Sequence, residues 1–165
     1  MDLQLTSEQQ QLVEAFSGLL GRHSTPEHVR AAEDSGFDPE LWKRIGELGA
    51  VPMAVGEGRG GWGASMLDLA LVAEQVGRSV ASVPLIEAQV AARLLATLDS
   101  LAADAMLSPV LEGARLITFA PRASTIGVAP LVPAGSVADD AIVLHGDELV
   151  LVPLRDDARS SIENL

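Results

Sequence analysis

The character of the sequence changes at Gly113, and this change constrains the fold more than any other feature. Before Gly113, apolar residues recur at intervals of three and four, which is typical of amphipathic helices. After it, short runs rich in Val, Ile, Leu and Thr alternate with Pro, Gly and Asp, which is typical of strands joined by turns. The sequence therefore predicts an α+β protein. An N-terminal all-α helical bundle over residues 1–113 precedes a partial antiparallel β-domain over residues 114–165.

Capping residues predict where several helices begin and end. Thr6 or Ser7 can cap the first helix, with Gln9 or Gln10 in the capping-box position. Gly49 follows a short amphipathic helix and is a natural C-terminal stop. Two prolines stand in the first turn of further helices, where a missing N–H is harmless: Pro26 and Pro39.

Three more helices are expected before Gly113. The stretch Met66–Gly77 is nearly all apolar, so we expect it to be buried on most sides as the central helix of the bundle. A last helix covers residues 100–112, with its end distorted or shortened by Pro109. Between them, a helix opened by Pro84 runs to about residue 98, with these residues facing inward: Leu85, Val90, Leu94 and Leu95.

Four strands are expected after Gly113. They cover residues 116–120, 125–129, 141–144 and 149–152. His145-Gly146-Asp147-Glu148 predicts a hairpin turn between the last two.

Composition excludes several classes of function. A net charge of −12 provides no basic stripe for phosphates, so neither nucleic acid nor an anionic membrane surface is an expected partner. The chain has no cysteine, no secretory signal and no apolar run long enough to span a membrane. We therefore expect a cytoplasmic protein without disulfides or thiolate metal sites.

Six short motifs follow one another along the helical part of the sequence. They are Thr6-Ser7-Glu8-Gln9-Gln10, Pro39-Glu40-Leu41-Trp42, Glu47-Leu48-Gly49, Gly60-Gly61-Trp62-Gly63, Glu74-Gln75-Val76-Gly77-Arg78 and Pro84-Leu85-Ile86-Glu87. Taken in this order, they resemble the N-terminal half of the acyl-CoA dehydrogenases, flavoenzymes that desaturate acyl-CoA thioesters. The version here is similar to a divergent actinobacterial branch of lipid and steroid degradation in which different subunits often pair.

The resemblance implies a three-part protein of which this chain holds the first part and some of the second. The family's catalytic carboxylate lies in or near the third part, so we assign no catalytic residue here and expect a fragment. The implied cofactor of the complete enzyme is FAD. Its implied partners are the acyl-CoA substrate, homologous subunits in a homo- or hetero-oligomer, and an electron-transfer flavoprotein. The family's Thr-Glu flavin motif is missing from residues 118–123, so no FAD ligand is assigned.

Two segments are candidate substrate-binding sites. Gly60 and Gly61 belong to a loop that either approaches the thioester and flavin or simply turns the chain toward the next helix. By resemblance, four residues line the inner end of the acyl pocket: Val83, Pro84, Ile86 and Glu87. A carboxylate in such a wall needs a partner or a raised pKa, and the alternative places Glu87 on the solvent side of its helix.

Other polar residues have structural interpretations. Glu74 and Arg78 are spaced for an ion pair along one helix. The three histidines are expected at the surface, and no metal site is predicted: His23, His28 and His145. Two pairs of acids are expected in solvated turns: Asp139-Asp140 and Asp156-Asp157.

Three hypotheses for function remain. The first is the N-terminal part of a flavin-dependent acyl-CoA dehydrogenase. The second is a non-catalytic partner subunit of a hetero-oligomeric acyl-CoA dehydrogenase, without a flavin site of its own. The third is a helical interaction module that binds no ligand.

Overall fold

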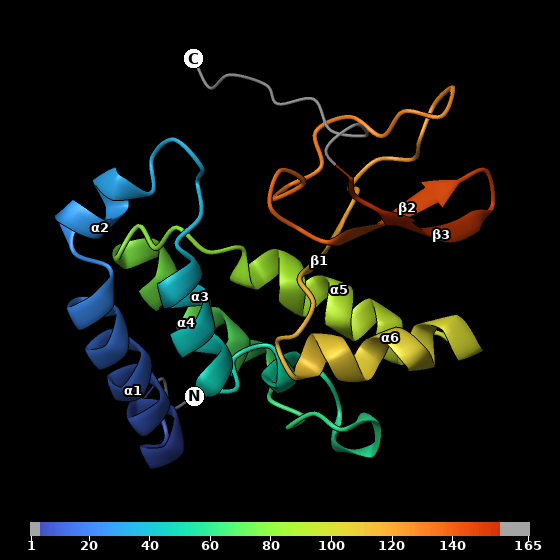
Figure 1. The fold of residues 1–165 in the computed structure, drawn as a ribbon. Coiled ribbons are helices and arrows are strands. Elements are labelled where there is room, and N and C mark those ends of the chain that lie inside the picture. Colours follow the sequence, from blue (N-terminus) through green and yellow to red (C-terminus); the bar gives the residue numbers. More distant parts are fainter. Residues whose placement is uncertain (1–3, 156–165) are drawn as a thin grey trace.

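A computed structural model describes residues 4–155 of the chain. These residues form an N-terminal group of helices followed by a small sheet, which confirms the α+β fold class (Figure 1). The helices are α1 (Ser7–His23), α2 (Pro26–Ala31), α3 (Pro39–Glu47), α4 (Met66–Arg78), α5 (Leu85–Thr97) and α6 (Leu101–Leu111), with 3₁₀ turns η1 (Pro52–Ala54) and η2 (Glu57–Arg59). The strands are β1 (Ile117–Phe119), β2 (Asp140–His145) and β3 (Glu148–Pro153).

The predicted capping signals are confirmed. The hydroxyl of Thr6 accepts a hydrogen bond from the Gln9 N–H at 3.2 Å, and the Gln9 side-chain oxygen accepts one from the Thr6 N–H at 3.1 Å. Pro26 and Pro39 stand in the first turns of α2 and α3. Gly49 follows α3 with a φ of +75°, a conformation that glycine adopts without strain. Local sequence therefore fixes these helix boundaries.

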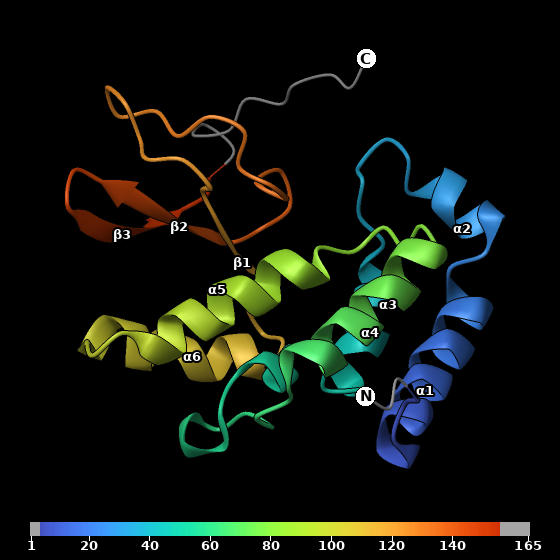
Figure 2. The same cartoon turned by 180° about the vertical axis from the view of Figure 1, so that it is seen from behind.

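The prediction that the helix at Met66–Gly77 is central is wrong, because α5 holds that position. One face of α4 packs on α1, while Met66 on the opposite face is 66% exposed. In contrast, α5 contacts η1, α6 and β1, and Figure 2 shows it lying beneath the sheet and beside α6. Small apolar residues explain the difference, since alanines at the buried positions of α5 let its neighbours approach closely: Ala88, Ala91 and Ala92.

The inward face of α5 was predicted only in part. Leu85 and Leu95 are buried as expected, and Leu94 is half-buried, but Val90 is 41% exposed. The buried residues follow Leu85 at helical intervals, and Val90 falls five residues on, on the other side of the helix. The next helix, α6, continues through Pro109 to Leu111. It ends one residue before the predicted end at residue 112, so the proline shortens it very little.

The sheet is mixed, so the expectation of a purely antiparallel β-domain needs correction. β2 pairs with β3 in antiparallel register from Asp140↔Pro153 to His145↔Glu148, which confirms the hairpin. β1 pairs with β2 in parallel, because the long connection between them returns the chain to the same end of the sheet before β2 begins. The strand predicted at 125–129 is instead a tight turn, closed by a Thr125–Val128 bridge.

The prediction that the first pair of acids lies in a solvated turn is wrong for Asp140, whereas Asp139 is exposed in the bend before β2. Asp140 is only 1% exposed and accepts a hydrogen bond from Arg115 Nε at 2.7 Å. The Asp139 carboxylate accepts one from the Leu116 N–H at 2.8 Å. Both acids therefore join β2 to the segment before β1. The other predicted pair, Asp156-Asp157, lies outside the described residues.

The connection between α6 and β1 spans residues 112–116, and the predicted domain boundary at Gly113 falls within it. The division into two domains at that residue stays a prediction. Within residues 4–155, none of the helices is long and apolar enough to cross a membrane.

Candidate functional site

The segment that leads into α5 is fixed by contacts with two other helices. The hydroxyl of Ser24, just after α1, donates to the Ser79 carbonyl at 3.1 Å. The N–H of Asp38, at the start of α3, donates to the Ser82 carbonyl at 2.8 Å. Pro84 then occupies the N-cap position of α5 and is buried. The position of the first turn of α5 is thus set by α1 and α3.

The four residues predicted to line an acyl pocket lie together there, but they face two environments. Val83 is half-buried against the core, and Pro84 is buried. Ile86 is 50% exposed, and Glu87 is half-buried on the open side of the helix. The first pair therefore anchors the helix start, while the second pair is available to a ligand.

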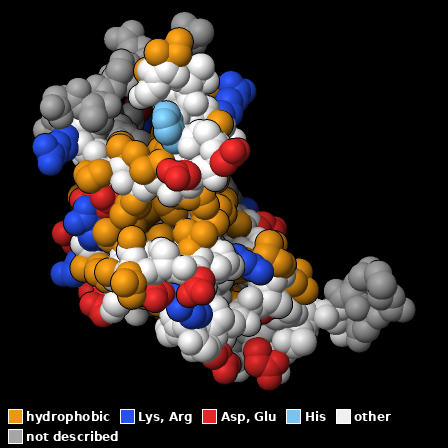
Figure 3. Space-filling view, turned by 90° about the vertical axis from the view of Figure 1, so that its right-hand side faces the viewer, with side chains coloured by type: hydrophobic (Ala, Val, Ile, Leu, Met, Phe, Trp, Pro, Cys, Tyr) orange, Lys and Arg blue, Asp and Glu red, His pale blue; other side chains and the backbone are white. Residues whose placement is uncertain are grey.

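An apolar stripe continues from Ile86 along the open side of α5. Val90 and Leu94 follow at intervals of four residues, so the three side chains lie on one helix face. The outer end of the β2–β3 hairpin adds three exposed apolar residues, Leu144, Leu149 and Val150. Figure 3 shows a broad band of apolar side chains across one side of the molecule, at the height where the sheet meets the helices. Such a band is typical of a surface that binds an apolar ligand or another chain.

Glu87 is the one acidic residue in the first turn of α5. Among residues 4–155, its carboxylate has no hydrogen-bond or ion-pair partner. The N-terminal end of a helix stabilises a negative charge, which makes an isolated carboxylate tolerable at this place. Glu87 can therefore accept a hydrogen bond from a hydroxyl group of a ligand that lies along Ile86.

The glycine loop forms a tight structural turn on a different part of the helical region. A Cβ on Gly61 would lie 2.1 Å from the Val55 carbonyl oxygen, and the Trp62 N–H donates to the Pro52 carbonyl at 3.0 Å. Gly60 has a φ of +86° and lines a hollow of about 530 Å³ between the loop and α6. Figures 1 and 2 both place this loop away from the first turn of α5, so the two predicted segments do not form one site.

The segment where a flavin motif was sought offers no free hydroxyl to a flavin ring. Thr118 is fully buried, and its hydroxyl donates to the Pro133 carbonyl at 2.6 Å. The next hydroxyl along the chain, on Ser124, lies 2.8 Å from His145 Nδ1. Residues 118–123 therefore do not fit the threonine contact that the family resemblance implies for FAD.

Polar residues predicted to be structural have simple roles here. Arg78 and Glu74 form an exposed ion pair at 3.5 Å, as predicted. Among residues 4–155, no group of three or more His, Asp or Glu side chains is placed to hold a metal ion.

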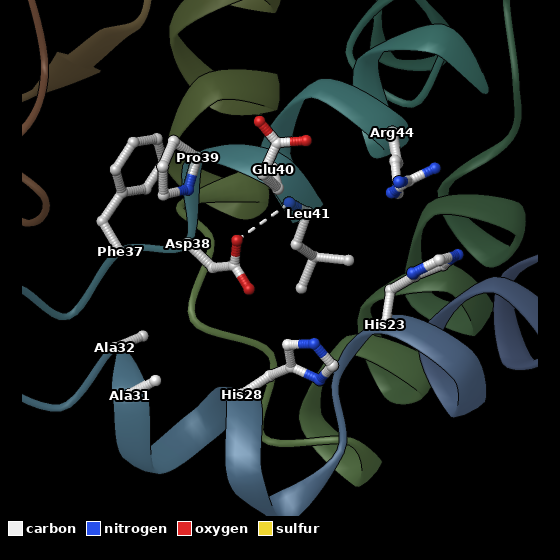
Figure 4. Close-up of a pocket in the computed structure, with 10 residues that line it drawn as sticks. All are labelled: His23, His28, Ala31, Ala32, Phe37, Asp38, Pro39, Glu40, Leu41 and Arg44. Carbon is white, nitrogen blue, oxygen red and sulfur yellow. Dashed lines mark hydrogen bonds between the residues drawn. The ribbon is translucent and has the colours of Figure 1, made fainter.

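A second hollow went unnoticed in the sequence, because its residues come from three helices. It has a volume of about 430 Å³ and lies where α1 ends and α3 begins (Figure 4). Two of the histidines expected at the surface, His23 and His28, point into it, together with Arg44. The one sequence signal for this meeting is the Thr25-Pro26 break, which turns the chain between the two histidines.

Comparison with known proteins assigns the helical region to a protein family. The family model of the acyl-CoA dehydrogenase N-terminal domain matches residues 6–112, more than half of the chain. The chain belongs to the acyl-CoA dehydrogenase family. It is 31% identical over 150 residues to "Acyl-CoA dehydrogenase IpdE2" of Mycolicibacterium smegmatis, an alignment that covers 88% of this chain and 45% of that protein. The predicted resemblance to a family of oxidoreductases is thereby confirmed.

Two solved structures share the fold. The ChsE4–ChsE5 complex from Mycobacterium tuberculosis matches with a TM-score of 0.76 and 26% identity, over 93% of this chain and 49% of that one. A variant of the Tcur3481–Tcur3483 steroid ACAD matches with a TM-score of 0.75 and 26% identity, over 88% of this chain and 48% of that one. The chain spans about half the length of the relatives that it matches.

Proposed function

We propose that this chain forms one wall of the acyl-binding cavity in a flavin-dependent acyl-CoA dehydrogenase of lipid or steroid degradation, which desaturates an acyl-CoA thioester between its α and β carbons. The observation that carries the proposal is the open apolar stripe of Ile86, Val90 and Leu94, with the partnerless Glu87 beside it. Two of the relatives support the same class of reaction by their names, IpdE2 and the steroid ACAD.

In this proposal, the stripe removes the acyl group from water. Covering apolar surface stabilises a complex by about 25 cal/mol for each Å² buried, so a tail that covers Ile86 and Val90 gains a few kcal/mol before the costs of association. Glu87 favours an acyl group that carries a hydroxyl near this wall. Val83 and Pro84 hold the helix start in place. We assign Gly61 the role of a structural turn, and Gly60 borders a separate hollow.

FAD supplies the redox chemistry of the complete enzyme, and in our proposal its ring contacts come from outside residues 118–123. The apolar band continues onto the β2–β3 hairpin, which supports a contact with a further chain of the same family. The heteromeric ChsE4–ChsE5 neighbour favours a homologous, non-identical subunit. An electron-transfer flavoprotein would accept the electrons.

A second candidate is a non-catalytic partner subunit with no flavin site of its own. The engagement of the Thr118 hydroxyl by Pro133 favours this alternative. Both candidates use the same acyl wall, and they differ in which chain holds the flavin.

The test is to purify the protein with the partners that accompany it and to measure flavin per chain from the visible spectrum. An acyl-CoA panel is then added without oxygen. The chains are also separated, and the flavin is assigned to the chain that keeps it. Flavin that stays with this chain and is bleached in the assembly supports the first candidate. Flavin that stays with a partner chain supports the second. A preparation that neither holds flavin nor binds any acyl-CoA contradicts both and favours an interaction module.

A further inference from the structure

The hollow between α1, α2 and α3 has the features of a second binding site. Its volume of about 430 Å³ lies within the range of small-molecule pockets. It lies where α1 ends and α3 begins, and α1 and α2 stand at the opposite end of the helical region from α6 (Figure 1). Its lining residues are His23, His28, Ala31, Ala32, Phe37, Asp38, Pro39, Glu40, Leu41 and Arg44.

Three cationic or potentially cationic side chains converge in this hollow. Figure 4 shows Arg44 and His23 side by side, with the ring of His28 facing them. Arg44 forms none of the ion pairs found among the described residues. Asp38 and Glu40 also line the hollow, so it carries no excess of positive charge while the histidines are neutral. The guanidinium of Arg44 is nevertheless open to an anion.

Burial and the neighbouring side chains change the pKa of His23. Burial lowers it most, and the neighbouring charges of Arg44, Arg22 and His28 lower it further, against an opposing effect of Asp38. A bound anion would offset the repulsion among these groups. Protonation of His23 and binding of an anion therefore favour each other.

The two carboxylates in the lining form no ion pair with Arg44. Asp38 caps α3, and its carboxylate accepts a hydrogen bond from the Leu41 N–H at 3.0 Å. The N-terminal end of α3 stabilises its charge. Glu40 points away from the two imidazole rings (Figure 4). Neither acid lies within ion-pair distance of Arg44.

The rest of the hollow is apolar. Ala31 and Pro39 are exposed, and Phe37 is half-buried with its ring 6.5 Å from that of Trp42. A hydrated inorganic ion gains nothing from such a surface, whereas the hydrocarbon part of an organic acid does. Charge and shape together select an anion that carries an apolar body.

We propose that this hollow binds a small organic carboxylate, with its oxygens held by Arg44 and His23 and its apolar part against Ala31 and Phe37. The site is separate from the acyl wall on α5 and does not depend on the proposed desaturation. A planar guanidinium matches a carboxylate with two parallel hydrogen bonds, which gives the geometry its selectivity.

The test uses the purified 165-residue chain and follows the imidazole proton resonances of His23 and His28 by NMR at constant ionic strength. Sodium benzoate is the probe, its neutral amide benzamide is the control for charge, and inorganic phosphate is the control for the apolar body. We expect saturable shifts with benzoate that benzamide does not produce. Affinity should rise as the pH falls from about 7 to about 5, because the pKa of His23 lies below the ordinary imidazole value and its protonation is coupled to binding of the anion.

Two variants separate this site from general charge attraction. Arg44→Gln should weaken benzoate binding by about tenfold or more, since it removes the charge-assisted hydrogen bonds. Arg30→Gln removes the same charge from α2, at a residue that does not line the hollow, and should leave the affinity within about twofold. Three results would overturn the proposal: no saturable shift with benzoate, equal loss in both variants, or phosphate binding as tightly as benzoate.

Discussion

The helical part and the β part of this chain are stabilised in different ways. Large apolar residues from α1, α3 and η1 fill a continuous core in the helical part: Phe16, Leu20, Leu41, Ile45 and Met53. The β part shares this core only through β1 and one face of β2, with Ile117 and Ile142, and it adds a few long-range polar contacts, above all Arg115–Asp140 and Thr118–Pro133. Its hairpin ends in exposed apolar side chains. The comparison shows that the helical part is stabilised by its own packing. The β part would be stabilised further if another surface buried the exposed end of its hairpin.

The largest expected effect tests the packing of the helical part. Gly61→Ala places a Cβ 2.1 Å from the Val55 carbonyl oxygen, where only a backbone shift could make room. We expect unfolding to become easier by about 3 kcal/mol or more, measured by chemical denaturation. Gly58→Ala, with no atom within 4 Å of the new Cβ, is the matched control. Equal stability of the two variants would contradict the tight turn.

The next effect tests the polar support of the β part. Arg115→Met leaves the buried Asp140 carboxylate without its partner, and we expect a loss of about 2 to 3 kcal/mol. Hydrogen exchange should increase in β1 and β2 before it increases in α1 and α3. Arg122→Met, at an exposed arginine, should change stability by no more than about 0.5 kcal/mol. A uniform increase in exchange across both parts would break the comparison.

A smaller effect is expected at a single helix cap. Thr6→Ala removes the hydroxyl that accepts from Gln9, and we expect a loss of about 1 kcal/mol in thermal or chemical unfolding. Ser7→Ala, one residue inside the helix, is the control. Many residues contribute to the core of the helical part, so Thr6→Ala should leave the hydrogen exchange of α5 unchanged.

The smallest effect concerns the exposed pair Glu74–Arg78. Glu74→Gln should cost no more than about 0.5 kcal/mol, and added salt should abolish the difference. A larger loss of stability that persists at high salt would mean that α4 packs against another surface in solution. The helical part would then also depend on contacts with another chain.

Signals that act over a few residues could be predicted from the sequence. Helix starts at Thr6 and Pro39, the stop at Gly49 and the hairpin at Gly146 depend on neighbours in the chain, and all were found. The family could be predicted from the order of its motifs. The central place of α5 could not, because its small alanines carry a weak hydrophobic signal although they are fully enclosed.

Features formed by residues far apart in the chain escaped prediction. Asp140 meets Arg115 across 25 positions, so a pair of acids in a turn-like setting gave no sign of burial. The parallel pairing of β1 with β2 depends on the path of the connection between them. Likewise, His23 and Arg44 share a hollow that spacing alone does not reveal. For the candidate site, the sequence predicted that Val83 to Glu87 lie in one segment. It did not predict which of these side chains are exposed.

The central claim is that the open face of α5 holds the acyl group, and its most direct test is the acyl-CoA dependence of flavin reduction in the assembled enzyme. Ile86→Asp places a charge in the stripe, and an acid in the first helical turn does not disturb the helix. Leu101→Asp, at a residue that is 89% exposed at the start of α6, is the control. We predict that Ile86→Asp raises the acyl-CoA concentration for half-maximal reduction by about tenfold or more, while Leu101→Asp leaves it unchanged. Equal curves for wild type and Ile86→Asp across all acyl chains would contradict the account.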